Sequence, residues 1–387
     1  MSKAEPRGQA VPLGTIAREW TRIGVTGFGG PPTHIALIRR LVVERRRWLT
    51  DQDIESAIAA CNLLPGPAST QLAIYVARRL SGPLGAVVGG VGFVLPAVIV
   101  VTALSAVFLA NSPPAWIRGA GAGAGAAVAA VAVQAGLSLL APSWQRVRAE
   151  SGRRIRWIAY ALLGAAAAAT LGPYLVLVLL ACGVAELLGR GGGRGVSAIA
   201  PGPLLLLATT GGIGALAWVA FKVGALSYGG GFVIVPLMQA DAVHTYHWMS
   251  SSGFLSAVAL GQVTPGPVTS TVAAVGYAAH GLGGAGLAAL IAFLPSFSLV
   301  LLGASQFDRL RANPRMQAFL DGAGPAAIGA ILGSAIPLAG ALKQSWQFVV
   351  LGAAAVALLV GRAGIVPVLI LAGLAGAVIG LAGGPLG

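Results

Sequence analysis

The sequence has 387 residues, of which 56% are hydrophobic and only 9% are charged. Soluble domains carry about 25% charged residues, so this composition excludes an ordinary soluble fold. The net charge is +14, but the basic residues are divided among short segments between apolar ones, which argues against a nucleic-acid-binding protein. An excess of Lys and Arg is typical of the cytoplasmic loops of a membrane protein, and we interpret it in that way.

In chain order, the first half begins with residues 13–37, which either span the membrane or lie at its interface, because three charged residues interrupt them. Residues 50–80 have basic residues on both flanks, which predicts a re-entrant segment that enters the membrane and returns to the same side. Apolar stretches of spanning length follow, since about 20 such residues cross a bilayer. The predicted spans of this half are residues 84–110, 119–141, 157–171 and 173–189.

The second half repeats the first at an offset of 200 residues. The segment Ile23–Gly30 matches Val223–Gly230, and Pro65-Gly66-Pro67 matches Pro265-Gly266-Pro267. A register held without a gap over about 70 residues indicates a duplication, which divides the chain into two repeats, 1–195 and 196–387. The second repeat is predicted to hold a re-entrant segment at 250–280 and spans at 203–226, 283–306, 317–340, 346–361 and 364–383.

Equivalent loops of the two repeats differ in charge. Loop 38–47 contains five arginines, whereas its counterpart 239–249 contains no Lys or Arg. Further along the difference reverses, because residues 111–117 lack a basic residue and the counterpart region 309–315 holds three arginines. Basic loops face the cytoplasm, so equivalent loops lie on opposite faces. We therefore predict an all-α polytopic membrane protein of two inverted-topology repeats, with a cytoplasmic N-terminus, a periplasmic C-terminus and re-entrant broken helices that meet near the midplane.

Each Pro-Gly-Pro break is a candidate substrate-binding site. Proline suits the first position of a helix and glycine permits the sharp turn, so a helix starts there with unpaired N–H groups and a positive dipole end. Such a helix end favours an anion, and nearby hydroxyl and amide side chains add hydrogen-bond donors. The alternative is a kinked helix with N-capping hydroxyls. The candidate residues at the breaks are Asn62, Pro65, Gly66, Pro67, Ser69, Thr70 and Gln71, with Gln262, Pro265, Gly266, Pro267, Thr269 and Ser270.

Two glycine runs and two basic residues complete the predicted site. Arg22 and Lys222 precede the runs at matching positions, and two cations beside helix N-termini suit a dianionic oxyanion. The alternative for both side chains is extension toward the membrane interface. The glycines of the runs that we include in the site are Gly29, Gly30, Gly229 and Gly230.

Coupling of transport to protons requires a titrating group. His34 follows the first glycine run and is placed with the site for that reason. The other candidates are Glu186, Asp241, His244, His247 and Asp321. The chain has no common catalytic motif and no His, Cys or carboxylate cluster with metal-ligand spacing, so we expect neither an enzyme nor a metal or other cofactor.

The chain resembles the chromate transporter family at several motifs. In the first repeat these are Phe28-Gly-Gly-Pro31 with His34, Trp48-Leu49 with Asp53, and Leu64-Pro-Gly-Pro67 with Thr70-Gln71. In the second repeat they are Tyr228-Gly-Gly-Gly231, Trp248 and Thr264-Pro-Gly-Pro267.

The resemblance implies a protein of the inner membrane that exports chromate, is driven by the proton-motive force and confers chromate resistance. It also implies sulfate, which has nearly the same shape, as a competitor of chromate. The expected surroundings are the lipid bilayer, with a homodimer left open and no nucleic-acid partner. Because a fold does not fix a substrate, transport of sulfate or another oxyanion remains an alternative, as does a non-transporting membrane scaffold or sensor.

Overall fold

The protein is an all-α membrane protein. The computed structural model describes residues 10–61, 66–110, 112–148, 150–171, 174–190, 212–227, 232–303 and 313–386, and every regular element within these ranges is helical. Four of the described helical segments are long and apolar enough to cross a membrane, which requires about 20 residues. They are Ala68–Phe108, Ala115–Gln145, Val268–Gly303 and Pro314–Gly340.

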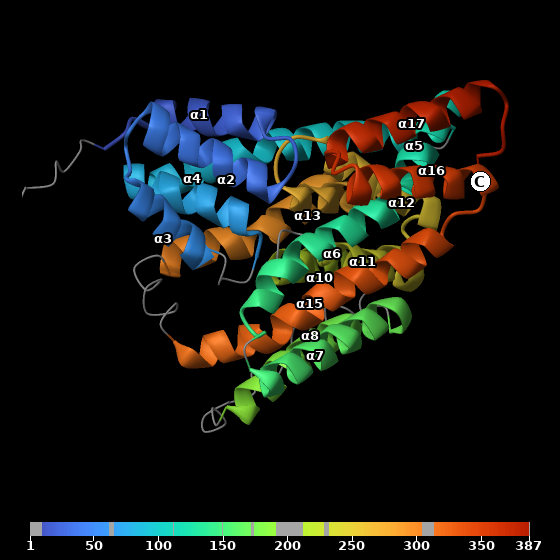
Figure 1. Cartoon of the computed structure of the whole chain (residues 1–387). Helices are drawn as coiled ribbons and strands as arrows, with labels where there is room; N and C mark the ends of the chain where they lie inside the picture. The colour runs from blue at the N-terminus through green and yellow to red at the C-terminus, as the bar shows by residue number, and fades with distance from the viewer. Residues whose placement is uncertain are drawn as a thin grey trace, which may run out of the picture.

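The first half of the chain begins at one end of the molecule and extends to the other (Figure 1). Its helices are α1 (Leu13–Thr26), α2 (Pro31–Arg39), the π-helix η1 (Arg40–Arg45), α3 (Asp51–Cys61), α4 (Ala68–Phe108), α5 (Ala115–Ala126), α6 (Val128–Gln145), α7 (Ser151–Thr170) and α8 (Leu175–Gly189).

The second half ends at the opposite end of the molecule from the start of α1 (Figure 1). Its helices are α10 (Gly212–Leu226), α11 (Ile234–Gln239), the π-helix η3 (Ala240–Thr245), α12 (Ser251–Val263), the 3₁₀-helix η4 (Val268–Thr271), α13 (Val272–Gly303), α15 (Pro314–Gly340), α16 (Ser345–Ala355), the π-helix η6 (Val356–Val360) and α17 (Ile365–Leu381).

The predicted segment 13–37 is two short helices rather than one span. The helix α1 ends at Thr26, and Gly29 and Gly30 adopt φ angles of 103° and 75° before α2 begins. These left-handed backbone angles are costly for any residue with a Cβ, so the helix cannot continue through them at low energy. The segment therefore consists of two helices separated by a break at the glycine run.

The two halves have the same backbone where the sequence repeat is strongest. The π-helices η1 and η3 are followed by Arg47 and His247, which have positive φ angles of 52° and 54°. In each half the backbone N–H of a tryptophan then donates to a carbonyl of the π-helix. Trp48 donates to Val42 and Trp248 donates to Ala242, both over 2.8 Å. Because positive φ is uncommon outside glycine, this matched pair is a specific structural correspondence.

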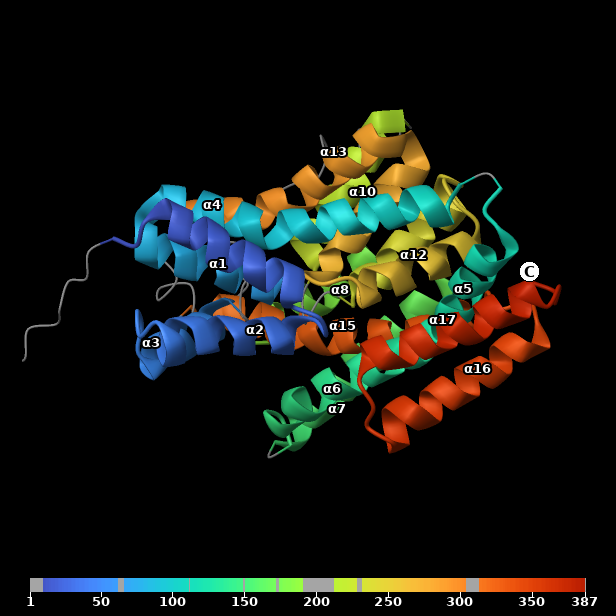
Figure 2. The ribbon, with the colours of Figure 1, turned by 90° about the horizontal axis from the view of Figure 1, so that it is seen from above.

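Helices of the two halves pack closely against each other. Figures 1 and 2 show α17 beside α5, and α15 beside α7. A Cβ added at Gly164 of α7 would overlap the Ala326 carbonyl of α15, and one at Gly329 of α15 would overlap the Ala161 carbonyl of α7. Small residues let membrane helices approach until their backbones touch, and this close packing is one of the forces that associate helices in lipid. The halves therefore form one packed unit.

Alanine at Gly329 is expected to lower thermal stability without a change in any polar group, because its Cβ has no space against Ala161. Overpacking of this kind typically costs about 1–3 kcal/mol. Gly352→Ala is the matched control, since nothing lies within 4 Å of a Cβ at that helical position. Thermal unfolding of both purified variants in detergent tests the difference; equal melting temperatures would contradict the packing.

Candidate functional site

Each Pro-Gly-Pro turn lies against the first helix of the other half. Gly66 and Gly266 adopt φ angles of 119° and 96°, which only glycine reaches easily. A Cβ on Gly66 would lie 3.5 Å from the carbonyl oxygen of Gly224 in α10, and one on Gly266 would lie 3.5 Å from that of Gly24 in α1. Gly24 and Gly224 are equivalent residues of the two repeats. The two breaks therefore make equivalent contacts: the break of the first half touches α10 of the second half, and the break of the second half touches α1 of the first half.

A hydrogen bond joins the second break directly to the first glycine run. The Gly266 N–H donates to the Gly27 carbonyl over 3.0 Å, and His34 Nε2 lies 2.9 Å from the same oxygen. A carbonyl only accepts, so Nε2 carries a proton. In the neutral ring Nδ1 then accepts from the Ser69 hydroxyl, 3.2 Å away. Ser69, His34, Gly27 and Gly266 thus form one polar chain that crosses from one half to the other.

The second half holds a simpler version of this chain. Ser227 takes the place of Gly27 in the repeat, and its hydroxyl lies 3.1 Å from that of Thr269, the counterpart of Ser69. The hydroxyl of Ser270 instead donates to its own turn at the Pro267 carbonyl. The structure therefore brings Ser69 and Thr269 to equivalent positions, while Ser270 is already bonded.

Buried polar atoms without a hydrogen-bond partner gather around the breaks. Within the described ranges, Thr70 Oγ1, Gln262 Nε2 and Ser296 Oγ have none, and all three residues are buried. An unsatisfied buried donor typically costs about 1–3 kcal/mol. Such donors are available to a polar ligand, and Ser296 Oγ lies 3.2 Å from the Cβ position of Gly66.

Sequence reasoning did not select Ser296. It is one of two serines in the apolar helix α13, directly after Pro295, and helical serines commonly bond their own backbone. The proline was the one available signal, because it interrupts the helix hydrogen bonds at that depth. Only the tertiary structure shows that the hydroxyl faces the first break.

The prolines differ from prediction by one position. Pro67 and Pro267 lie at the N-cap, with ψ angles of 103° and 132°, and the helices begin at Ala68 and Val268. An extended ψ at the proline turns the preceding chain away from the helix axis. The sharp turn at the glycine before it requires this direction. Gln71 is buried in the first turn of α4, and its side-chain nitrogen lies 2.6 Å from the Cβ position of Gly66.

The two predicted cations are not brought to the breaks. Lys222 Nζ lies 2.6 Å from Asp241 Oδ2, and both side chains are buried, with the ring of Trp218 5.6 Å from the ammonium. Gly224 faces the first break and lies two residues after Lys222, which is about 200° further round α10, so the Lys222 side chain leaves the helix on the opposite face. Arg22 is exposed on α1. Lys222 therefore ties α10 to η3, and Arg22 is at the surface.

Four predicted site residues lie outside the described residues. They are Asn62, Pro65, Gly229 and Gly230. Gly29 and Gly30 are described, and Gly30 is the N-cap of α2. The polar chain of Ser69, His34, Gly27 and Gly266 contains only described residues.

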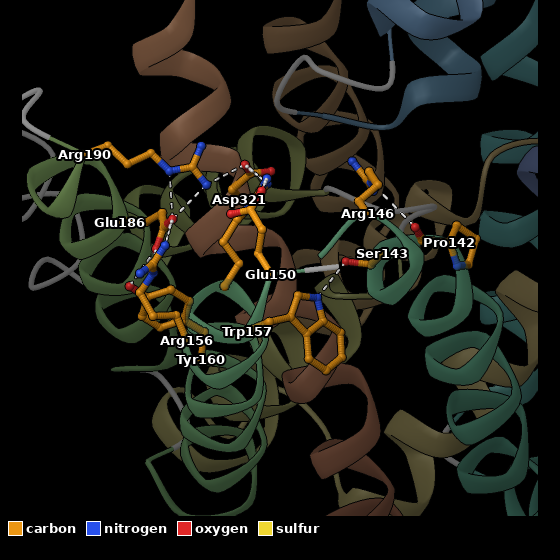
Figure 3. A network of polar contacts seen from close by, with 11 residues as sticks. Pro142, Ser143, Arg146, Glu150, Arg156, Trp157, Tyr160, Glu186, Arg190 and Asp321 are labelled. Atoms are coloured by element: carbon orange, nitrogen blue, oxygen red, sulfur yellow. Dashed lines mark hydrogen bonds and ion pairs between the residues drawn. The ribbon is translucent and has the colours of Figure 1, made fainter. Parts of the chain in front are cut away.

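Two of the titrating candidates belong to an ion-pair network at the ends of α7, α8 and α15 (Figure 3). Arg190 bridges the two carboxylates, with nitrogen–oxygen distances of 2.8 Å to both Glu186 and Asp321. Arg156 and Tyr160 also bond Glu186, and Arg153 bonds Asp321. The network joins the end of the first half to the second, and its carboxylates are already paired.

Comparisons with known proteins agree in the class of protein they find. A family model described as Chromate transporter matches residues 14–187 and 214–381. A chromate transport protein of Cupriavidus metallidurans is 34% identical over 342 residues, which cover 84% of this chain and 82% of that protein. A chromate transport protein of Pseudomonas aeruginosa is 31% identical and the match covers 92% of this chain and 89% of that one. A probable chromate transport protein of Synechococcus elongatus is 28% identical, with 85% of each chain covered. No solved structure matches.

Proposed function

Because the chain belongs to the chromate transporter family, we propose that it is a secondary transporter that exports chromate across the inner membrane. Export would be driven by the proton-motive force and would confer chromate resistance. The observation that carries the proposal is that each Pro-Gly-Pro break contacts the opposite half of the chain. The hydrogen bond from Gly266 to Gly27 joins the second break to the first half. A substrate bound there would touch both halves, as alternating access requires.

The proposed substrate is a tetrahedral dianion, and the donors around the breaks are consistent with one. Broken backbone at membrane depth is tolerated only where protein or a polar cavity satisfies it, and helix N-termini supply N–H donors and a positive dipole. The Thr70 hydroxyl, the Gln262 amide and the Ser296 hydroxyl add donors that no described residue uses. In this proposal Ser69 and Thr269 hold the first turn of α4 and the 3₁₀-helix η4, and His34 links Ser69 to the glycine run.

We also propose that the halves are inverted repeats. Two observations support this: the elements recur at an offset of 200 residues, and the start of α1 lies at the opposite end of the molecule from the C-terminus. Transport would then be a rocking of one half against the other about the exchanged contacts at Gly24 and Gly224. The N-terminus would be cytoplasmic and the C-terminus periplasmic, as the basic loops indicate.

Transport in everted membrane vesicles tests the proposal. An exporter should accumulate labelled chromate in such vesicles when a pH gradient is imposed, and a protonophore should prevent it. Excess sulfate should lower the rate, since the two anions have nearly the same shape. Accumulation of sulfate with no movement of chromate would favour the other oxyanion function. If neither anion moved and neither raised the melting temperature of the purified protein, the scaffold alternative would hold.

Ser296→Ala is expected to weaken anion binding without loss of stability, because the hydroxyl has no partner in the described protein to lose. Removing one hydrogen bond to a charged ligand typically costs about 1.5–3 kcal/mol, which is roughly 10-fold or more in affinity. Ser105→Ala is the control, since that equally buried serine donates to the Val101 carbonyl and is far from the breaks in sequence.

The measurement is the sulfate-dependent shift in melting temperature together with the KM for transport. Ser105→Ala should lower the melting temperature without sulfate and leave KM unchanged. A normal KM for Ser296→Ala would remove this serine from the site.

A further inference from the structure

A cavity of about 500 Å³ opens at the other end of α12 from the second break. Its walls come from the end of α4, from α5, from the start of α12 and from α13. The helix α12 runs from this cavity to Val263, just before Pro265, and its 13 residues span roughly 20 Å. The polar residues that line the cavity are Arg118, Trp248, Ser250, Ser252, Ser256 and Tyr277, and no lining residue is acidic.

Arg118 gives the cavity its charge. Its side chain is exposed and forms no ion pair with any carboxylate of the described ranges. Serine residues at the start of α12 line the same space. The Ser250 hydroxyl accepts from the Gly253 N–H and lies 3.1 Å from the Ser252 hydroxyl. A guanidinium together with several hydroxyls is a donor set suited to an oxyanion.

The first repeat shows what the same helix end looks like when the protein neutralises it. At the start of α3, Asp51 pairs with Arg39, and Asp53 accepts from Thr50 and Arg79. Burial acts to raise the pKa of Asp53, but the hydrogen bonds from Thr50 and the charge of Arg79 outweigh it and hold the pKa below its ordinary value. The carboxylate therefore stays ionised against the helix N-terminus.

The second repeat has no acidic residue at the equivalent positions. The positions equivalent to Asp51, Asp53 and Glu55 are Ser251, Gly253 and Leu255. The helix end at α12 thus keeps its positive potential, and Arg118 adds a full charge beside it. The two ends therefore differ in whether carboxylates occupy the helix N-terminus.

We propose that this cavity is an outer vestibule that binds a tetrahedral oxyanion, with Arg118 as its charged ligand. Its place on the transport path rests on the proposed function, since α12 leads from the vestibule to the second break. Anion binding in the vestibule does not itself require transport. The vestibule holds the anion between the broken-helix site and the periplasm, and Arg118 raises the local anion concentration.

Charge-selective labelling of a cysteine at the cavity tests the proposal. Ala110→Cys places a thiol among the lining residues, and the two native cysteines are buried. The rate of reaction with an anionic sulfonatoethyl thiosulfonate is compared with that of a cationic trimethylammonium reagent. Inorganic sulfate is the competing anion, because chromate would oxidise the thiol. Labelling of whole cells from outside also reports on which side the vestibule opens.

The expected result is faster reaction with the anionic reagent and protection by sulfate. Arg118→Gln should lower the anionic rate about threefold, raise the cationic rate and abolish protection, since one nearby charge at the surface contributes on the order of 0.5–1 kcal/mol. Lys343→Gln is the matched control, because it removes an exposed positive charge that does not line the cavity. Equal effects of both substitutions, or no protection by sulfate, would overturn the vestibule.

The outcome separates the vestibule from the proposed function. If sulfate protects the cysteine but vesicles move neither chromate nor sulfate, the transport proposal fails and the vestibule stands. If vesicles accumulate chromate but sulfate gives no protection and Arg118→Gln has no effect on labelling, the vestibule fails and transport stands.

Discussion

Replacing Gly266 with alanine is expected to reduce transport on the order of 100-fold, because displacement of a binding group by about 1 Å can have an effect of that size. The added Cβ would lie 2.7 Å from Ala97 Cβ, and the strain at a φ of 96° would shift the N–H that bonds Gly27. Gly66→Ala should act in the same way, since its Cβ would meet the Gln71 side-chain nitrogen at 2.6 Å. Initial rates of uptake into everted vesicles, normalised to folded protein, measure the effect.

Gly281→Ala separates the contact from the backbone strain. Gly281 has a φ of 60° and a ψ of −149°, a conformation reached almost only by glycine, but nothing lies within 4 Å of an added Cβ. This variant should be less stable and should still transport. If it loses transport as fully as Gly266→Ala, strain in the helix rather than the contact between halves is the cause.

Lys222→Met is expected to abolish transport and to destabilise the protein strongly, because it leaves the Asp241 carboxylate buried without its partner. Breaking a buried ion pair by removing one member typically costs about 3–5 kcal/mol. The double variant Lys222→Met with Asp241→Asn should recover much of both stability and transport, since neither charge is then left alone. Melting temperature and vesicle transport of the two single variants and the double variant form a complete cycle.

The same cycle distinguishes a structural lysine from a substrate ligand. If Lys222 binds the dianion directly, the double variant stays inactive, although it folds. Arg46→Gln in the first repeat is a useful comparison, because Arg46 bonds Glu19 of α1 but Arg18 and Arg45 also lie near that carboxylate. Its loss should have a smaller effect on stability than Lys222→Met.

The breaks could be predicted because proline and glycine act on the backbone locally. Gly66 and Gly266 adopt positive φ angles, and a Pro-Gly-Pro sequence in an apolar segment indicates a turn without knowledge of its neighbours. The all-α membrane class follows from composition and segment length for a similar reason, since both are properties of the chain alone. The roles of the polar and charged side chains, in contrast, depend on contacts between segments that are distant in the sequence.

Lys222 shows why the remainder could not be predicted. A lone cation in an apolar helix has the same sequence pattern whether it faces a substrate or a buried carboxylate, and Asp241 is separated from it by a glycine run and a second helix. Equivalence with Arg22 suggested one shared role, but Arg22 is exposed on α1 whereas Lys222 is buried on α10. The role of Ser296 could not be predicted for the same reason, because it depends on which segment this face of α13 contacts.

The close glycine contacts between α7 and α15, and between α5 and α17, have a consequence for biogenesis. In each pair the first helix is synthesised well before its partner, yet its small-residue face is shaped to touch that partner's backbone. When α8 has been inserted, α5 and α7 still present these faces to lipid or to the insertion machinery. Assembly of this membrane protein is therefore completed late, when α15 and then α17 leave the ribosome, and a chain that stops after α8 lacks the partners of these two glycine contacts.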